Sequence, residues 1–370
     1  MKERFLQLHI LTAYPPSNVN RDDMGRPKTA VVGGAMRLRI SSQSLKRAWR
    51  TSEQFEKELK EYIGIRSKRI GEDLVNALVN GGIQEKKAFS WIKKMLDKFQ
   101  TEPKKEKDTD DNTDTSDEKT SEKTNKKSKE ILEQMVHFSP EEKKALDNLI
   151  HVLIERKSDP TEDELNSLRK KEIQAADIAL FGRMLAKHPE SNQDAAAQVA
   201  HSFTTHKVAI EDDFFTAVDD LNTGEVDRGS SHLGVMEFGS GIFYTYVCIN
   251  RKLLAENLQN NEELAQKTIQ AFVEAVATVG PSGKQNSFAQ HVRSEYILAE
   301  LGDQQPRSLS MAFQKPVQTV SYDIQHDSID RLEKMKKDIE NAYGLSSEKN
   351  YLLQVGKEGN IQGLKAFCAE

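Results

Sequence analysis

Cysteine is scarce in this sequence, with only Cys248 and Cys368 among 370 residues. Two thiols cannot form a disulfide framework or a four-thiolate zinc site, which excludes small domains held together in these ways. Long apolar runs are also lacking. The longest, GIFYTYVCI at 241–249, has nine residues, whereas a membrane-spanning helix needs about 18. No basic-then-apolar leader precedes the first strand pattern, so we expect no signal peptide, no membrane partner and a location in the cytoplasm.

Motifs for catalysis are missing as well. The stretch GPSGK at 280–284 has too few residues between its glycines for a phosphate-binding P-loop and no Ser or Thr after the lysine. No G-x-S-x-G string and no Cys/His nucleophile pattern is present. Some residues of metal-ligand type lie close together in sequence, but their spacings match no standard site, and we expect no metal and no cofactor. These residues are His201, His206, Asp212, Asp213, Asp219, Asp220 and His232.

One acidic pair leaves a catalytic alternative open. Asp22 and Asp23 lie in a basic loop near the N-terminus, where they could polarise a ribose hydroxyl or hold Mg²⁺ for RNA cleavage. The simpler interpretation is that they pair with Arg21 or Arg26. A metal-dependent ribonuclease that uses one of these carboxylates therefore stays as the alternative to a non-catalytic function.

The charge is unevenly distributed. The chain has a net charge of −5, yet residues 1–50 contain ten Lys/Arg and three Asp/Glu, a local charge of +7 that leaves −12 for the other 320 residues. Such a basic segment indicates an anionic partner better than the net charge does. Residues 101–130 contain no hydrophobic residue but ten acidic and eight basic ones. A segment with nothing to bury is predicted to be a flexible loop.

Strand and helix patterns alternate along the chain. A capping box, Ser139 with Glu142, starts one of the clearest helices, and Pro140 occupies its first position. The order of the elements predicts an α+β fold, a small α/β sandwich with insertions, which a ferredoxin-like or RNA-recognition-motif core would fit. Strand patterns occur at 4–12, 36–40, 199–207, 235–250 and 292–301, and helix patterns begin at 43 and recur at 86–99, 139–157 and 264–276.

A basic cluster surrounds the second strand and the helix that follows it. Arg37 and Arg39 alternate with apolar residues, which predicts a strand with one apolar and one basic face. Ser41 and Ser42 are candidate N-caps of the helix. Helix N-terminal amides and hydroxyls donate to phosphate oxygens, and cations add charge, so a phosphate backbone suits this cluster. A solvated basic face is the alternative. The residues that follow in the cluster are Gln43, Ser44, Lys46, Arg47 and Arg50.

Apolar residues interrupt a polar segment farther along. Phe214 and Phe215, with Val218 and Leu233 beyond the turn, lie in a predicted excursion between strands. Exposed apolar side chains on a hairpin can insert between bases and unstack them. The alternative is that these residues fasten a loop to the core.

Longer strings resemble a known family. The segment HILTAYPPSNVNRDDMGRPKTAVVGGAMRLRISSQSLKRAWR is similar to the amino-terminal signature of CasC, the repeated backbone subunit of the type I-E CRISPR Cascade complex. The strings DIALFGRM, AHSFTTHKV, DDFFTAVDDL and SSHLGVMEFGSGIFYTYVCIN resemble its later blocks. The resemblance covers residues 1–60 and about 175–300, and it is weaker through 60–170 and after 300.

The resemblance implies a hand-shaped protein with a modified RNA-recognition-motif palm, helical fingers and a β-hairpin thumb. It assigns 1–62 to the first part of the palm, 63–175 to the fingers with the 101–130 insertion, 176–200 to the palm, 201–235 to the thumb and 236–370 to the second part of the palm. The positions that match the family's RNA-contacting motif are Arg21, Lys28, Ser41, Gln43, Lys46, Arg47 and Arg50, together with Met184 against the bases. The positions that match the base-displacing thumb are Phe214, Phe215, Thr216, Val218 and Leu233.

The resemblance also implies a function and partners. The chain would be a non-catalytic scaffold that polymerises along the CRISPR RNA and displaces bases at intervals, so that the guide pairs with target DNA in antiviral defence. Its partners would be CRISPR RNA, the paired DNA strand, neighbouring copies of itself, and the large, small, 5′-end cap and crRNA-processing endonuclease subunits. Finger lysines are candidates for contacts with DNA, namely Lys143, Lys144, Lys170 and Lys171. An RNA-binding protein unrelated to CRISPR is a further alternative.

Overall fold

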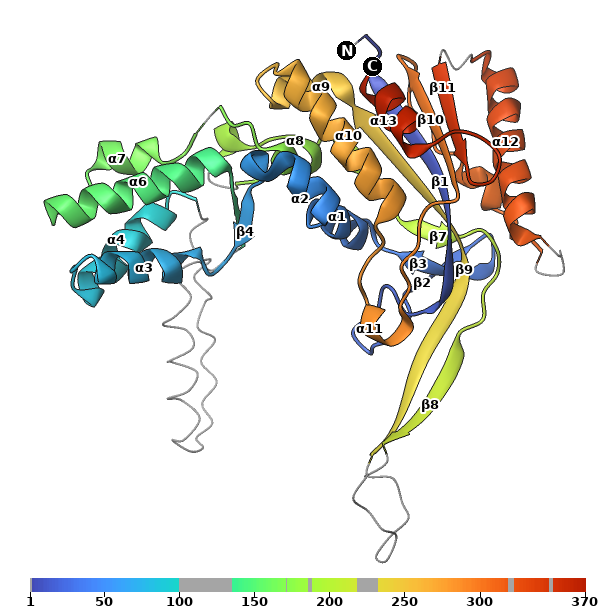
Figure 1. Cartoon of the computed structure of the whole chain (residues 1–370), viewed down its shortest axis with the longest axis horizontal. Helices are drawn as coiled ribbons and strands as arrows, with labels where there is room; N and C mark the ends of the chain where they lie inside the picture. The colour runs from blue at the N-terminus through green and yellow to red at the C-terminus, as the bar shows by residue number, and fades with distance from the viewer. Residues whose placement is uncertain are drawn as a thin grey trace, which may run out of the picture. The chain divides into compact units, whose positions relative to one another are not determined.

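The computed structural model describes residues 2–99, 135–170, 172–185, 188–217, 232–318, 323–345 and 349–370. The chain divides into two compact units (Figure 1). The first unit comprises 1–59, 197–253 and 262–370, and the second comprises 60–196 and 254–261. Within these described residues no helix is long and apolar enough to cross a membrane. The flexible loop predicted at 101–130 lies outside the described residues.

The first unit is built on an antiparallel sheet. Its main path runs in the order β11-β10-β1-β9-β7-β3-β2, and β6 and β8 also pair with β9. All pairings between these strands are antiparallel. The strands are β1 (Phe5–Ser17), β2 (Thr29–Val32), β3 (Ala35–Ile40), β6 (Ala197–Val199), β7 (Ser202–Thr204), β8 (Glu211–Ala217), β9 (His232–Asn250), β10 (Tyr296–Gly302) and β11 (Lys349–Gln354).

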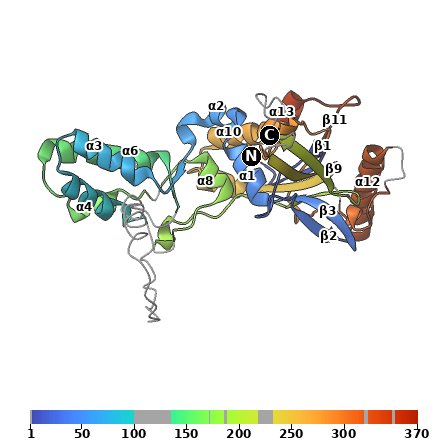
Figure 2. The same ribbon diagram turned by 90° about the horizontal axis from the view of Figure 1, so that it is seen from below.

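Helices cover both faces of this sheet. Helix α10 packs on α1, α2 and α13, and the sheet's other face shares a hydrophobic cluster with η3 and α12. Figure 2 shows α10 and α12 on opposite sides of the strands. Because both faces are covered, β1 is buried along most of its length, as expected for a central strand. The helices are α1 (Ser42–Arg50), α2 (Glu53–Leu59), α10 (Glu262–Thr278), α11 (Gln285–Phe288), η3 (Ser310–Phe313), α12 (Ile324–Tyr343) and α13 (Ile361–Ala369).

A buried polar network joins β1, β9 and β10 on the α12 side of the sheet. Leu309 N–H donates to the Tyr244 hydroxyl (3.0 Å), which lies 3.0 Å from His9 Nδ1, and His9 Nε2 lies 3.1 Å from a Glu300 carboxylate oxygen. Burial lowers the pKa of His9, so the ring is neutral at pH 7. Burial alone would raise the pKa of Glu300, but His9 and the Arg307 guanidinium (3.1 Å) outweigh it and bring this pKa to about 2.

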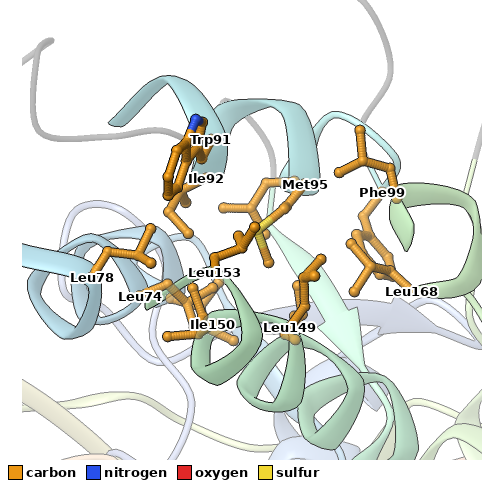
Figure 3. Close-up of a cluster of buried hydrophobic side chains, with 14 of the residues drawn as sticks. Leu74, Leu78, Trp91, Ile92, Met95, Phe99, Leu149, Ile150, Leu153 and Leu168 are labelled. Carbon is orange, nitrogen blue, oxygen red and sulfur yellow. The ribbon is translucent and has the colours of Figure 1, made fainter. Parts of the chain in front are cut away.

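The second unit is a helical domain with a small two-stranded sheet. Its core contains Trp91, Ile92 and Met95 of α4, packed on leucines of α3 and α6 (Figure 3). The predicted capping box is present, since Glu142 N–H donates to Ser139 Oγ (3.2 Å) and Ser139 N–H to the Glu142 carboxylate (2.9 Å). The elements are η1 (Lys60–Tyr62), β4 (Ile65–Ser67), α3 (Ile70–Asn80), α4 (Glu85–Leu96), β5 (Val136–Phe138), α6 (Pro140–Arg156), α7 (Glu162–Ser167), α8 (Ala176–Phe181) and η2 (Pro189–Ser191), and α9 (Arg251–Asn257) contributes residues to both units.

The predicted mixture of helices and strands is confirmed, with two differences of detail. The helix predicted to begin at residue 43 is divided into α1 and α2, because Ser52 Oγ donates to the Trp49 carbonyl (2.7 Å) and accepts from Phe55 N–H (3.3 Å). Residues 176–196 fall in the second unit and 197–200 in the first. The division into palm, fingers and thumb stays a prediction.

One expectation about β3 is wrong. Arg37 is fully buried, whereas Met36, on the expected apolar face, is 45% exposed. The Arg37 guanidinium donates to the carbonyl oxygens of Thr204 (2.7 Å) and Phe313 (3.0 Å). Since both faces of the sheet are covered, alternation along the strand did not reveal which face meets solvent. Arg37 therefore stabilises the interior and does not belong to a basic surface.

Candidate nucleic-acid interface

An open polar groove of about 490 Å³ lies at the basic end of the first unit. Three segments line it: the loop after β1, one face of α1, and the loop at 281–283. Two of the predicted cations, Arg21 and Arg47, are exposed on its walls, together with Asp22 and Asp23. The remaining lining residues are Val19, Asn20, Gly25, Ser44, Ala48, Thr51, Pro281, Ser282 and Gly283.

Helix α1 is held so that one face borders the groove. The Ser41 side chain accepts from Ser44 N–H (3.4 Å), which confirms Ser41 as the N-cap. Leu45 and Trp49 are buried, and the Trp49 indole N–H donates to the Val279 carbonyl (3.0 Å). With this side anchored, the residues at helical spacing on another side, which include Arg47, are left to line the groove.

The loop after β1 is ordered by its own side chains. Asp22 Oδ1 accepts from the backbone N–H groups of Met24 (3.0 Å) and Arg26 (2.9 Å), and the Arg26 guanidinium pairs with Glu237 (3.2 Å). Asn20 Oδ1 accepts from Ser41 N–H (2.8 Å), which ties the loop to the start of α1. The Arg26 guanidinium therefore pairs with Glu237, and Asp22, one of its expected partners, instead accepts from the Arg26 backbone in a turn. One carboxylate oxygen of Asp22 is already occupied by loop hydrogen bonds.

The third wall was missed by sequence reasoning. Gly283 approaches the loop after β1 so closely that a Cβ at this position would lie 2.3 Å from the Val19 carbonyl oxygen. Gln290 Nε2 donates to the Gly283 carbonyl (2.6 Å) and fixes the loop from the other side. The GPSGK stretch is therefore no P-loop but a groove wall. Gly280 and Gly283 were the signal for this wall in the sequence, because glycine often occurs where two backbone segments approach each other closely.

The other predicted RNA-contacting residues of this unit lie outside the groove lining. Gln43 is exposed in the first turn of α1, and Lys46 and Arg50 are partly exposed one turn apart on the same side of the helix. Burial lowers the pKa of Lys46. Lys28 is partly exposed near His201. Of the cations in the predicted RNA-contacting set, Arg21 and Arg47 line the groove, and Lys28, Lys46 and Arg50 are not among its lining residues.

The β8–β9 hairpin contains the predicted thumb residues. Phe214 is opposite Val235, and each is 64% exposed. Phe215 is opposite Gly234 on the other face of the hairpin, and its ring fills the space that a Cβ at Gly234 would occupy (2.2 Å). Thr216 is exposed. The aromatic pair therefore divides between the two faces. Val218 and the side chain of Leu233 lie outside the described residues.

The second unit contains Met184 and the candidate lysines. Met184 is 82% exposed, directly after Arg183, whose guanidinium is buried against Glu142 (2.5 Å). Lys143 pairs with Asp147 in α6, whereas Lys144 is exposed and Lys170 is partly exposed. Lys171 lies outside the described residues.

Candidates for metal or thiol chemistry find little support. In the part of the chain that the structure describes, no group of three His, Cys, Asp or Glu residues is placed to hold a metal ion. Both cysteines are buried. Burial raises the pKa of the Cys248 thiol to about 11 and raises that of Cys368 as well, so neither thiol is ionised at pH 7.

Comparisons with known proteins agree with this picture. Residues 6–366 match the model of the CT1975-like protein family. One solved structure, a chain of a "CRISPR RNA-guided surveillance complex, pre-nicking", has 26% identity and a TM-score of 0.78 over 98% of this chain and 100% of that one. A second, from a "CRISPR RNA-guided surveillance complex", shares the fold at 21% identity and a TM-score of 0.68, over 97% and 94% of the two chains. No curated protein sequence matched.

The family match spans nearly the whole chain. The fold and the family match thus define a class, the CRISPR-associated proteins similar to subunits of surveillance complexes. The chain belongs to the CT1975-like protein family and is a CasC-like subunit, which confirms the resemblance seen in the sequence.

Proposed function

We propose that this protein is a non-catalytic, guide-RNA-binding scaffold subunit of a type I-E CRISPR Cascade complex in the cytoplasm. Several copies polymerise along the CRISPR RNA, hold its phosphate backbone and displace bases at intervals, so that the guide pairs with target DNA in antiviral defence. The similarity to a subunit of an RNA-guided surveillance complex along the full length of both chains supports this proposal.

The observation that carries the proposal is the open groove with Arg21 and Arg47 on its walls. A scaffold that accepts any guide must contact phosphate and ribose and avoid reading base edges. Exposed guanidinium groups beside the Ser44 hydroxyl suit that task, because all of them donate to oxygen, whereas the Thr51 hydroxyl already donates to the Arg47 carbonyl (2.9 Å). The groove is lined mainly by polar side chains and backbone, as a sequence-independent site requires.

Strand order supports an RNA-recognition-motif palm in the first unit. The four strands β10, β1, β9 and β7 are neighbours in that order, and each pair is antiparallel. Along the chain, α1 and α2 lie between β1 and β7, and α10 lies between β9 and β10. This is the β-α-β-β-α-β arrangement of ferredoxin-like cores. Because helices cover both faces of the sheet, RNA contact is favoured at the groove and not on a sheet face.

The β8–β9 hairpin is proposed as the thumb. Phe214 and Val235 offer an exposed apolar face that can partly offset the few kcal/mol lost when a base is unstacked. Met184 is proposed to contact bases from the second unit, and Lys144 and Lys170 to attract target DNA. The proposed partners are CRISPR RNA, target DNA, neighbouring copies and the other Cascade subunits.

The test is the salt dependence of RNA binding. Wild type and the Arg21→Gln/Arg47→Gln double variant are titrated with a 30-nucleotide fluorescent RNA at several KCl concentrations. Loss of two phosphate contacts should weaken binding and reduce the slope of log K against log [salt] by about 1.4, since each contact contributes about 0.7 on single strands. Arg156→Gln is the control, because it also removes one exposed arginine, at the end of α6, where Arg156 pairs with Glu164 of α7. Equal slopes in the double variant and the control would refute the groove assignment.

A metal-dependent ribonuclease is the second candidate, because Asp22 and Asp23 line the same groove. The loop hydrogen bonds of Asp22 Oδ1 make Asp23 the better candidate for a metal ligand. Mg²⁺-dependent cleavage of guide-complementary RNA that disappears in Asp23→Ala would favour this function. RNA left intact by wild type with Mg²⁺ would favour the scaffold.

A further inference from the structure

A second basic cluster lies beside the groove, at the start of α1. It consists of Lys28 before β2, Arg39 of β3 and His201 between β6 and β7. Arg39 N–H donates to the Lys28 carbonyl (2.8 Å), and Lys28 N–H donates to the Asn20 carbonyl (2.8 Å). Asn20 also lines the groove. The cluster and the groove are therefore held by the same loop.

The hydrogen bonds of His201 define where its proton lies. Ser42 N–H (3.1 Å) and an Arg39 guanidinium N–H (3.2 Å) both donate to His201 Nδ1. Neither group can accept a hydrogen bond, so Nδ1 must be the unprotonated nitrogen of a neutral ring. The proton is then on Nε2, and this N–H belongs to an exposed side chain. His201 is thus a hydrogen-bond donor in a fixed orientation.

The charge of the cluster is not balanced by acids. Within the described residues, neither Lys28 nor Arg39 pairs with a carboxylate, and both act on the His201 ring as positive charges. Two uncompensated cations and an oriented N–H attract an anion with several acceptor oxygens. A phosphodiester of the bound RNA has this chemistry.

We propose that Lys28, Arg39 and His201 form a second phosphate-binding subsite, in which the His201 Nε2–H donates to a phosphate oxygen of the guide RNA. This inference rests on the proposed function. It adds His201 to the RNA-contacting residues and a hydrogen bond from its Nε2–H to phosphate. His201 also positions Arg39 and the first N–H of α1, so the subsite is assembled before the RNA arrives.

The subsite has a consequence for pH. Burial, followed by the charges of Arg39 and Lys28, lowers the pKa of His201. A bound phosphate counteracts the two cations and must raise that pKa. By linkage, RNA affinity then increases as the pH falls, by tenfold for each unit of increase in the pKa.

The experiment measures binding of a 30-nucleotide oligo(U) to the full-length protein from pH 8 to pH 5.5 at constant ionic strength. His201→Asn keeps an acceptor for Ser42 N–H but loses the distal donor, so we expect about tenfold weaker binding and a flat pH profile. His326→Asn is the control, since His326 is 55% exposed on α12 and pairs with Asp330. It should behave like wild type.

A second readout needs no variant of the subsite. In wild type with ¹³C-labelled histidine, oligo(U) and inorganic pyrophosphate should each raise the pKa of the His201 ring, measured by NMR. An unchanged pKa on saturation, or wild-type affinity and pH dependence in His201→Asn, would overturn the subsite. If the wild type binds no RNA, the scaffold function fails, and the pyrophosphate titration still decides the subsite.

Discussion

The substitution Gly283→Ala tests whether the groove is a rigid feature. A Cβ at this position would lie 2.3 Å from the Val19 carbonyl oxygen, 2.8 Å from the Val19 carbonyl carbon and 3.1 Å from the Asn18 carbonyl oxygen. All three atoms belong to the backbone, so no side-chain rotation relieves the overlap. Ordinary contact begins near 3.4 Å, which means that the two loops must separate by about 1 Å. Overpacking of this kind costs about 1–3 kcal/mol.

The assay compares Gly283→Ala with Gly302→Ala in urea denaturation and in RNA binding. A Cβ at Gly302 meets nothing within 4 Å, so this control should change the free energy of unfolding by less than about 0.5 kcal/mol and leave RNA binding intact. Gly283→Ala should lower the unfolding midpoint and, well below that midpoint, bind RNA more weakly. If both variants unfold and bind alike, the close approach of the two loops does not shape the interface.

Three further outcomes are expected. Arg37→Met should lower the free energy of unfolding by about 2–4 kcal/mol in urea titrations, because two buried carbonyl groups lose their donor; a change within 0.5 kcal/mol would contradict this. Phe214→Ala/Phe215→Ala should keep most RNA affinity, which charge provides, but abolish periodic nuclease footprints on the guide; footprints that stay periodic would exclude the thumb role. Stability should fall as the pH drops below about 6.5, where unfolded His9 gains a proton that the folded form excludes, and again from about 4.5 towards 2 as Glu300 is protonated. In pH-dependent urea midpoints His9→Gln should lose the upper step and reduce the lower one, because His9 also helps to lower the Glu300 pKa; an unchanged upper step would contradict this.

Local patterns were sufficient for the elements and part of the interface. The cap at Ser41 and the capping box at Ser139 depend on neighbours within one helical turn, so the sequence predicted them. The position of Arg37 depends on carbonyl groups 167 and 276 residues away, which strand alternation does not encode. The Gly283 wall was missed for the same reason, because its partner is the distant Val19 backbone.

The length of β9 fixes how far the hairpin reaches. Residues 239–250 pair with β1, residues 232–238 pair with β8, and the strand continues without a break between them. At about 3.3 Å per residue the 19-residue strand spans about 63 Å. One continuous strand therefore connects the β8–β9 hairpin directly to the middle of the sheet. Removing two residues from each strand of the hairpin would shorten it by about 7 Å and keep every side chain on its face of the hairpin. Removing one would shorten it by half as much and turn the Phe214 face over.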